Sequence, residues 1–486
     1  MTRRQRLGLV LGPLVFLSFW LGPKPAALSP EAWHAGAVSL WMAVWWITEA
    51  LPIPATALLP IVLFPVLGVR SIGEATAPYA HPIIFLFMGG FLLAQAMQRW
   101  RLHRRLALHI IRRIGTRPAR LVLGFLLAGA FLSLWVSNTA TALMMLPIAL
   151  SVLELLEERG AVQPTLRTFE AALVLSIAYG CNIGGMGTLI GTPPNALLAG
   201  FLSETYGYEL SFATWLPLGL PIVTIGLLLT YLLLIFVLFP EGRRLQVEAR
   251  GLIQAELAAL GPVQPAERRV AWVFAVTALL WIGRPLLSQW VPGLSDAGIA
   301  IGAALVLFLL PAGQGRRLLD WESARHLPWG ILLLFGGGLS MADAITDTGL
   351  ARWIGQQVGG LAGWPPLLIV LLATGTIVFL TEITSNTAVA AAFLPVLASA
   401  AVGLGQNPLL LAVPATLGAS CAFMLPVATP PNAVVYSTGR ITMTEMARAG
   451  FWLNLLFILL LAGLAFLLLP LTLSVEVGRL PTWAQP

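Results

Sequence analysis

Apolar stretches of about twenty residues recur along almost the whole chain, and a helix of that length crosses the hydrocarbon core of a bilayer. Charged side chains make up only 10% of the 486 residues, against roughly 25% in a soluble domain. No water-soluble fold can hide so much apolar surface from water. The sequence therefore predicts an all-α polytopic membrane protein.

The apolar pattern divides into eleven shorter segments and two longer ones. The shorter segments lie at 8–24, 36–52, 54–68, 82–98, 168–200, 215–239, 269–290, 296–311, 330–345, 408–436 and 450–472. The longer segments, 120–155 and 364–402, are each interrupted by the tripeptide Ser-Asn-Thr. We expect each to form a re-entrant helical hairpin, because broken backbone is tolerated at membrane depth where it lines a protein-enclosed cavity. The prediction is about 11 transmembrane helices plus two hairpins.

The basic residues predict the orientation. All but five of the 28 Lys and Arg residues lie at the N-terminus or in the loops 99–120, 156–167, 240–269, 312–329 and 437–449. Because basic loops stay in the cytoplasm, the N-terminus is expected there and the C-terminus outside, in a membrane that we take to be a bacterial inner membrane. Segment 99–118 has the pattern of an amphipathic helix on the cytoplasmic surface, where a positional anchor is favoured over lipid binding. The net charge of +7 thus reports topology and predicts no nucleic-acid partner.

Two copies of one unit make up the sequence. Gly89-Gly90 precedes Ser137-Asn138-Thr139 by the same number of residues by which Gly337-Gly338 precedes Ser385-Asn386-Thr387. Further along, Thr192-Pro193-Pro194-Asn195 recurs as Thr429-Pro430-Pro431-Asn432. The first hairpin would enter from the cytoplasm and the second from outside, so the repeats have inverted topology. This is the architecture of secondary transporters, which bind substrate and ions on broken helices between the repeats.

The Ser-Asn-Thr tripeptides are candidate anion sites. Each is expected at a hairpin tip where the second helix begins, so free backbone N–H groups and the positive end of a helix dipole point into the cavity. The Asn amide and the Thr hydroxyl add donors for carboxylate oxygens, and two facing tips could hold the two ends of a dicarboxylate. Because no additional basic residue lies beside either tip to meet a third carboxylate, we predict a C4 dicarboxylate such as succinate, fumarate or malate.

The Thr-Pro-Pro-Asn pieces are candidate sodium sites. Proline removes N–H donors and breaks the helical ladder, which leaves carbonyl oxygens without partners. Carbonyl and hydroxyl oxygens suit a small hard cation, whose charge would offset that of the bound anion. One sodium ion is expected in each repeat, between the hairpin tip and the nearby unwound helix.

Other classes of protein fit less well. An intramembrane enzyme would need a base or metal ligands near a nucleophile, and Ser137 and Ser385 have no His or Lys partner evident in the sequence. A channel would need a continuous polar face, whereas the polar groups here gather at two discontinuities. Glu382 lies at membrane depth, where pairing with a backbone donor is favoured over proton coupling. Three other carboxylates near span ends are expected to be solvated or to cap helices: Glu49, Asp343 and Asp347.

These motifs, together with Trp46-Ile-Thr-Glu-Ala-Leu-Pro52 and Phe423-Met-Leu-Pro426, resemble the divalent anion/sodium symporter (DASS) family of dicarboxylate and citrate carriers. The resemblance spans nearly the whole chain and implies a homodimer whose static scaffold carries an elevator-like transport domain. The substrate contacts that it implies are Ser137, Asn138, Thr139, Thr192, Pro193, Ser385, Asn386, Thr387, Thr429 and Pro430. The sodium ligands that it implies are Ser133, Ser137, Asn138 and Gly191 in one site, and Thr381, Ser385, Asn386 and Ala428 in the other.

The resemblance also divides the chain into parts. They are scaffold helices with the amphipathic helix (1–118), the transport part of the first repeat (119–240), a cytoplasmic linker (241–268), scaffold helices of the second repeat (269–363) and its transport part (364–486). The expected function is import of C4 dicarboxylates coupled to sodium. Some relatives exchange dicarboxylates without sodium, but the hydroxyls of Ser133 and Thr381 favour sodium coupling. A citrate or sulfate carrier of the same fold stays an alternative.

Overall fold

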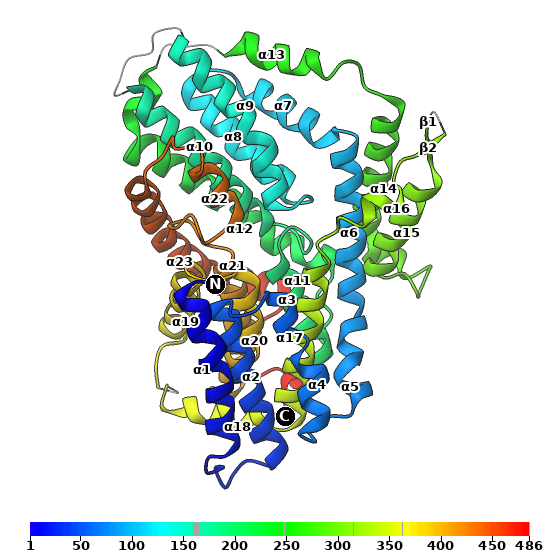
Figure 1. Ribbon diagram of the computed structural model, residues 1–486, viewed down its shortest axis with the longest axis vertical. Helices are drawn as coiled ribbons and strands as arrows, with labels where there is room; N and C mark the ends of the chain where they lie inside the picture. The colour runs from blue at the N-terminus through cyan, green and yellow to red at the C-terminus, as the bar shows by residue number, and fades with distance from the viewer. Residues whose placement is uncertain (159–164, 246–248, 314, 362, 486) are drawn as a thin grey trace.

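Helices form almost the whole structure (Figure 1). The computed structural model describes every residue except 159–164, 246–248, 314, 362 and 486. Parts of the predicted loop 156–167 and of the predicted linker 241–268 therefore lie outside the described residues. Within the described residues, strands occur only as a short antiparallel pair, β1 (Pro311–Gly313) and β2 (Arg316–Arg317).

The first half of the chain runs from α1 to α13. Its elements are α1 (Arg3–Trp20), α2 (Pro30–Thr48), α3 (Ile53–Thr56), α4 (Leu59–Val66), α5 (Ile72–Thr76), η1 (Ala77–Ala80), α6 (Pro82–Arg99), α7 (Leu102–Ile114), α8 (Pro118–Ser133), α9 (Asn138–Glu158), α10 (Thr165–Gly185), α11 (Pro193–Tyr206), α12 (Phe212–Leu232), η2 (Leu233–Leu238), η3 (Pro240–Arg244) and α13 (Arg250–Ala259).

The second half repeats this order in outline. Its helices are α14 (Pro265–Leu287), α15 (Asp296–Leu309), α16 (Trp321–Ala324), α17 (Trp329–Asp347), α18 (Leu350–Gln357), η4 (Val358–Leu361), α19 (Pro366–Thr381), α20 (Asn386–Gly403), α21 (Leu409–Ala419), α22 (Pro430–Tyr436), α23 (Met443–Leu473) and η5 (Thr482–Ala484).

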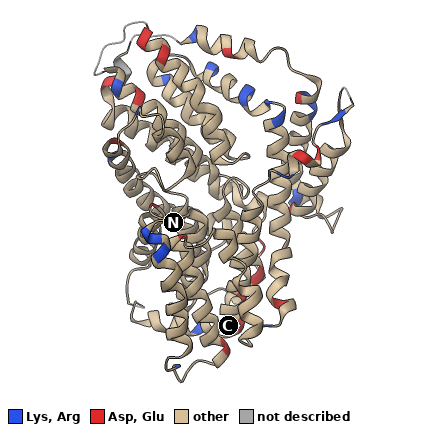
Figure 2. Cartoon of the chain, viewed as in Figure 1, with Lys and Arg blue, Asp and Glu red and all other residues tan. Residues whose placement is uncertain are grey.

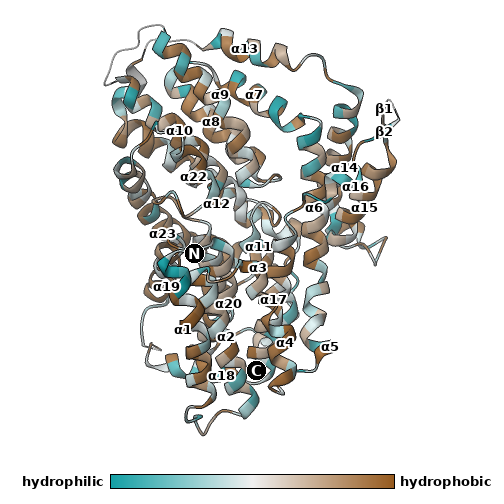
Figure 3. Ribbon diagram, viewed as in Figure 1, coloured by the Kyte–Doolittle hydropathy of each residue, from teal (hydrophilic) through white to brown (hydrophobic). Residues whose placement is uncertain are grey.

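Local sequence explains many helix starts. Ser29 caps α2 by accepting a hydrogen bond from the backbone N–H of Ala32, and Pro30 fills the first turn, where no N–H donor is needed. Thr442 and Glu445 form a reciprocal capping box at the start of α23. These caps set the entry points of long apolar helices, whose hydrophobic residues predominate through the body of the molecule (Figure 3).

Seven helical segments of the described chain are long and apolar enough to cross a membrane alone. They are Ile72–Arg99, Asn138–Glu158, Phe212–Leu238, Pro265–Leu287, Trp329–Asp347, Asn386–Gly403 and Met443–Leu473, and a bent pair, Leu350–Leu361 with Pro366–Thr381, would make an eighth. The all-α polytopic architecture is thus confirmed. The number of eleven spans stays a prediction, since the segments expected at 168–200 and 408–436 are each broken into two helices.

The two interrupted segments are helix–break–helix units. α8 packs against α9, and α19 packs against α20. Each break is four residues long and ends in the Ser of the Ser-Asn-Thr tripeptide, at Leu134–Ser137 and at Glu382–Ser385. The helices therefore break at the positions where the sequence predicted the hairpin tips.

The second halves of the broken helices cross between the repeats. α22 packs against α9 and α10 of the first repeat, and α11 packs against α20 and α21 of the second. The two repeats are consequently interlocked around their hairpins.

α7 is an amphipathic helix, as predicted for 99–118. Leu102, Leu108 and Ile111 are buried, whereas Arg112 and Arg113 are exposed. Figure 2 shows the basic residues strung along this helix. The buried face packs on α8, so the helix anchors the first hairpin from one side.

Small residues let α10 approach α8 closely. Gly180 and Gly184 lie one turn apart, and a Cβ on them would stand 2.5 Å from the carbonyl oxygen of Leu126 and 2.3 Å from that of Ala130. Glycines four residues apart are a common way to bring membrane helices into backbone contact. The contact fixes the first hairpin against the first broken helix.

Gly184→Ala should therefore push α10 away from α8. We expect a loss of about 1–3 kcal/mol of stability from overpacking, read as a lower midpoint of thermal unfolding in detergent. Gly302→Ala is the matched control, since a Cβ there meets nothing within 4 Å. Equal midpoints for the two variants would show that the crossing tolerates a side chain.

Candidate functional site

A cavity of about 770 Å³ lies between the repeats. Both hairpin tips and both Thr-Pro-Pro pieces line it, so the structure brings together every residue predicted to contact substrate. These residues are Ser137, Asn138, Thr139, Thr192, Pro193, Ser385, Asn386, Thr387, Thr429 and Pro430. Gly191 and Ala428 also line the cavity, whereas Ser133 and Thr381 are fully buried outside its lining.

Four helix N-termini meet at this cavity. Asn138 and Asn386 are the first residues of α9 and α20, and Thr192 and Thr429 are the N-caps of α11 and α22. At the two hairpin tips, the free N–H groups and the helix dipole favour a negative charge. α11 and α22 each begin with two prolines, which have no N–H, so these two ends contribute their dipoles. The lining can therefore bind an anion with more than one acidic group.

The asparagines of the two Thr-Pro-Pro-Asn motifs hold the unwound backbone in place. The Asn195 amide donates to three carbonyl oxygens of the stretch before α11, those of Gly185 (3.3 Å), Met186 (3.2 Å) and Thr188 (2.8 Å). The Asn432 amide donates in the same way to Ala422 and Leu425, at 3.0 Å each. The sequence pointed to the Thr and Pro of these motifs as ligands and left the Asn without a role.

Asn182 links the first repeat to the second broken helix. Its amide lies 3.2 Å from the Ala422 carbonyl oxygen, 3.1 Å from Thr429 Oγ1 and 3.2 Å from Asn432 Oδ1. It lines the cavity and is 1% exposed. Sequence analysis missed Asn182 because it belongs to no repeated motif. The one feature that could have indicated it is a polar side chain inside an apolar helix.

Oxygen atoms without donors converge beside the first tip. Ser133 Oγ and Asn138 Oδ1 are buried and have no hydrogen-bond partner among the described residues. A Cβ on Gly185 would lie 3.0 Å from Asn138 Oδ1 and 3.1 Å from the carbonyl oxygen of Gly191. Glycine keeps this spot open, and oxygens that lack donors suit a small cation such as sodium.

The equivalent place in the second repeat is built differently. Thr381 Oγ1 lies 2.7 Å from Asn386 Oδ1 and 2.8 Å from the carbonyl oxygen of Ala419. One hydroxyl proton can serve only one of these two acceptors, so an oxygen is again left for a cation. The sequence did not predict a role for Ala419, because every residue type has the same backbone carbonyl.

Glu382 fastens the second hairpin to the second unwound stretch. Its carboxylate accepts hydrogen bonds from the backbone N–H groups of Phe423 (2.7 Å), Met424 (2.9 Å) and Leu425 (3.1 Å) and from the Asn454 amide (2.8 Å). These contacts favour the structural role over proton coupling, because the four donors hold the carboxylate between the hairpin and the unwound stretch. In the first repeat Leu134 takes this place, and its carbonyl accepts a bond of 2.5 Å from Thr188.

The sequence did not predict that four further residues line the cavity. Gln95 and Gln98 come from α6, Glu49 ends α2, and His326 precedes α17. They lie outside the repeated motifs, and only the packing brings them to the site.

One expectation about carboxylates was wrong. Asp343 is 5% exposed, so it is neither solvated nor a helix cap, and Arg70 donates to it at 3.1 Å. Arg70 also pairs with Asp347. The sequence offered no way to see this, because Arg70 lies far upstream in the chain.

Glu382→Gln should loosen the second hairpin. The NH₂ group of the glutamine would face backbone N–H groups of the unwound stretch, which need an acceptor. We expect a loss of about 2–4 kcal/mol of stability. Thermal unfolding measures this loss, with the exposed Glu154→Gln on α9 as the control. The pH profile of any residual transport should keep its wild-type form. A stable variant whose pH profile changes would instead make Glu382 a proton carrier.

Comparison with known proteins adds to this geometry. Residues 4–472 match the sequence profile described as the sodium:sulfate symporter transmembrane region. The chain is 45% identical over 484 residues to the sodium-dependent dicarboxylate transporter SdcS of Staphylococcus saprophyticus, covering 98% of this chain and 93% of that protein. It is 44% identical, with the same coverage, to the protein of that name from Staphylococcus aureus strain USA300.

Two solved structures share the fold at low sequence identity. The YdaH transporter of Alcanivorax borkumensis superimposes with a TM-score of 0.58 and 16% identity, over 88% of this chain and 98% of that one. MtrF of Neisseria gonorrhoeae superimposes with a TM-score of 0.59 and 14% identity, over 97% and 96%. Both support the all-α architecture.

Proposed function

Since this chain belongs to the sodium:sulfate symporter family, we propose that it carries C4 dicarboxylates across a membrane together with sodium ions. The DASS resemblance drawn from the motifs is confirmed, and the family consists of transporters. The observation that carries the proposal is the cavity in which two hairpin tips and two broken helices meet. The relatives named sodium-dependent dicarboxylate transporters support the choice of substrate and ion.

The substrate would lie between the two tips. Ser137, Asn138 and Thr139 would bind one carboxylate, and Ser385, Asn386 and Thr387 the other, with Thr192 and Thr429 close by. All of them line the same cavity. A second carboxylate at the far tip distinguishes a dicarboxylate from sulfate, which could use only one tip at a time.

Sodium would occupy the two clusters of oxygens beside the tips. The first site would draw on Ser133, Ser137, Asn138 and Gly191, and the second on Thr381, Ser385, Asn386 and Ala428. The unpartnered oxygens of Ser133 and Asn138 support the first site. Because the ligating Asn residues also line the cavity, an ion there would order the tips before the anion binds.

We infer that the cavity opens to the predicted cytoplasmic side. Its wall includes Gln98 and His326, which adjoin or lie in loops that we predict to be cytoplasmic from their basic residues. We propose that the structure is the inward-facing state of an elevator, with the hairpins and broken helices moving against the remaining helices. The N-terminus would then be cytoplasmic, the C-terminus outside, and two copies would form the homodimer that the family resemblance implies.

Uptake of radiolabelled succinate into proteoliposomes tests the function. An inward sodium gradient should drive uptake. Replacing sodium by potassium should abolish it, because the proposed clusters of carbonyl and hydroxyl oxygens suit a small cation and potassium is larger. Uptake that needs only internal succinate would establish the sodium-independent exchanger. Competition by citrate or sulfate, with none by succinate, would overturn the choice of substrate.

Ser133→Ala should weaken sodium binding specifically. Removing one oxygen from the first site should raise the sodium concentration for half-maximal uptake by roughly 3–30-fold, corresponding to about 0.7–2 kcal/mol. The control is Ser176→Ala on α10, whose buried hydroxyl donates to the Leu173 carbonyl oxygen away from the cavity. An unchanged sodium dependence in Ser133→Ala would remove this hydroxyl from the ion site.

A further inference from the structure

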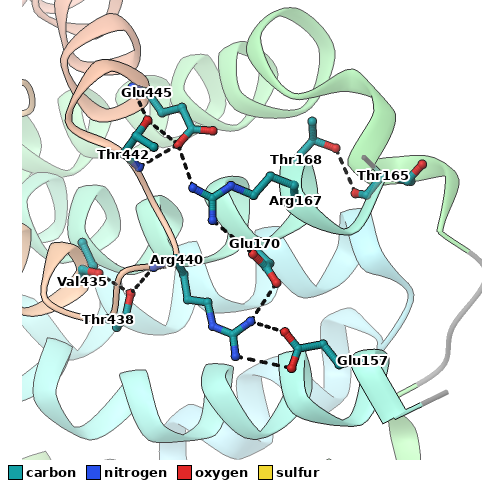
Figure 4. A network of polar contacts seen from close by, with 10 residues as sticks. All are labelled: Glu157, Thr165, Arg167, Thr168, Glu170, Val435, Thr438, Arg440, Thr442 and Glu445. Atoms are coloured by element: carbon teal, nitrogen blue, oxygen red, sulfur yellow. Dashed lines mark hydrogen bonds and ion pairs between the residues drawn. The ribbon is translucent and has the colours of Figure 1, made fainter. Parts of the chain in front are cut away.

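Five charged residues join the two repeats at one end of the hairpins. Arg440, in the loop between α22 and α23, pairs with Glu157 on α9 and lies 3.0 Å from Glu170 on α10 (Figure 4). Arg167 lies 3.6 Å from Glu170 and 3.5 Å from Glu445 at the start of α23. We call these five residues the cross-repeat cluster. Only Arg167, Glu157 and Glu170 come from the first repeat, so the cluster is a contact between repeats.

The cluster holds the far end of a short helix whose near end lines the cavity. α22 has 7 residues, which at 1.5 Å per residue is a length of about 10 Å. Thr429 caps its N-terminus at the cavity, and Arg440 follows shortly after its C-terminus. A hydrogen-bonded turn joins Arg440 to the C-terminus of α22, so a shift of Arg440 would be passed through this turn and the helix to Thr429 and Pro430.

The surroundings make this contact firm. The Glu170 side chain is 4% exposed and lies between the two arginines. The Arg440 guanidinium presents a planar fork to Glu157 and Glu170 together, a geometry that lysine cannot copy. The hydrogen bond to Glu157, and then the charge of Glu170, raise the pKa of Arg440 above its ordinary value. The cation therefore persists over the whole physiological pH range.

The opposite end of the hairpins has a counterpart built on aromatic rings. There the loop after α11 is held by the C-terminal segment, since the Trp483 ring lies 5.7 Å from that of Tyr206 and 4.7 Å from that of Tyr208. The same segment reaches the end of the second hairpin, where the Gly478 N–H donates to Gln406 at 2.8 Å. Each cross-packed helix, α11 and α22, is thus pinned at its far end, one by aromatic packing and the other by ion pairs.

We infer that Arg440 is a positioning residue that sets the distance between the two half-sites and thereby the length of dicarboxylate that fits. The inference rests on the proposed function. It follows because α22 carries part of the second half-site while its far end is fixed to α9 and α10, the helices of the first. Without Arg440, α22 keeps its packing against α9 and α10 and the bonds from Asn182 to Thr429 and Asn432, but it loses the ion pairs that fix its far end.

Arg440→Gln in the full-length protein in proteoliposomes tests the inference. We expect the KM for succinate to rise about 10-fold, because small misplacements of binding groups carry large effects, while the maximal rate stays within about 2-fold of wild type. Competition by malonate, succinate and glutarate should show a flattened preference for chain length. A purely structural role would lower the amount of folded protein and leave both KM and length preference unchanged.

Three further variants keep the test decisive. Arg479→Gln removes a comparable ion pair, with Glu476, on an exposed segment and should leave KM unchanged. Arg440→Lys keeps the charge and loses the fork, so it should show an intermediate KM even if Arg440→Gln does not fold. The double variant Arg440→Gln/Glu157→Gln should be no worse than Arg440→Gln alone, since the two act as one pair.

The outcomes separate the two claims. A wild-type KM and length preference in folded Arg440→Gln, or in Arg440→Lys if only that variant folds, would overturn the role of Arg440. Failure of the wild-type protein to carry succinate would overturn the proposed substrate instead. The length preference would then be measured with sulfate and with longer dianions as competitors of whichever anion the wild type carries.

Discussion

The structure depends on satisfying backbone that is not helical at membrane depth. Unwound backbone exposes N–H and C=O groups, and each one without a partner costs several kcal/mol away from water. Here Asn195 and Asn432 supply donors to carbonyl oxygens, and Glu382 supplies acceptors to N–H groups. The breaks persist because these side chains take over the bonds that the helix has lost. What they leave unpaired, chiefly at Ser133 and Asn138, is the part of the site that can bind an ion.

The two repeats use different side chains to satisfy the unwound backbone. In the second repeat a carboxylate bridges hairpin and unwound stretch, while in the first repeat Leu134 stands at the same place and Thr188 makes a single bond to its backbone. The Asn residues of the motifs, by contrast, play the same part in both. The motif asparagines are therefore preserved more strictly between the repeats than the contacts behind the tips. The two proposed sodium sites would differ in their hydroxyl groups, because Ser133 Oγ has no hydrogen-bond partner among the described residues and Thr381 Oγ1 lies 2.7 Å from Asn386 Oδ1.

The sequence could predict those features that are written in residue types and their spacing. Paired Ser-Asn-Thr and Thr-Pro-Pro-Asn motifs located the tips and breaks, and the cavity gathers all of them. The sequence could not give the contribution of Ala419, which acts through its carbonyl, or of Asn182, Gln95 and Gln98, which reach the site by packing. It also could not pair Arg70 with Asp343. Such contacts join segments hundreds of residues apart, and a single sequence carries no record of them.

The absence of basic side chains from the described wall of the cavity favours coupling between anion binding and cation binding. Among the described residues on its wall there is no Lys or Arg, so the groups at the two tips that would meet a bound dianion are helix ends, hydroxyls and amides. Helix ends offer about half an elementary charge each and are screened where the cavity is open to water. An arginine would bind the substrate whether or not sodium was present, and the carrier could then run without the ion gradient. Under the proposed function the countercharge would arrive with the sodium ions. Substrate binding and sodium binding would then be linked equilibria, each strengthening the other by the same factor.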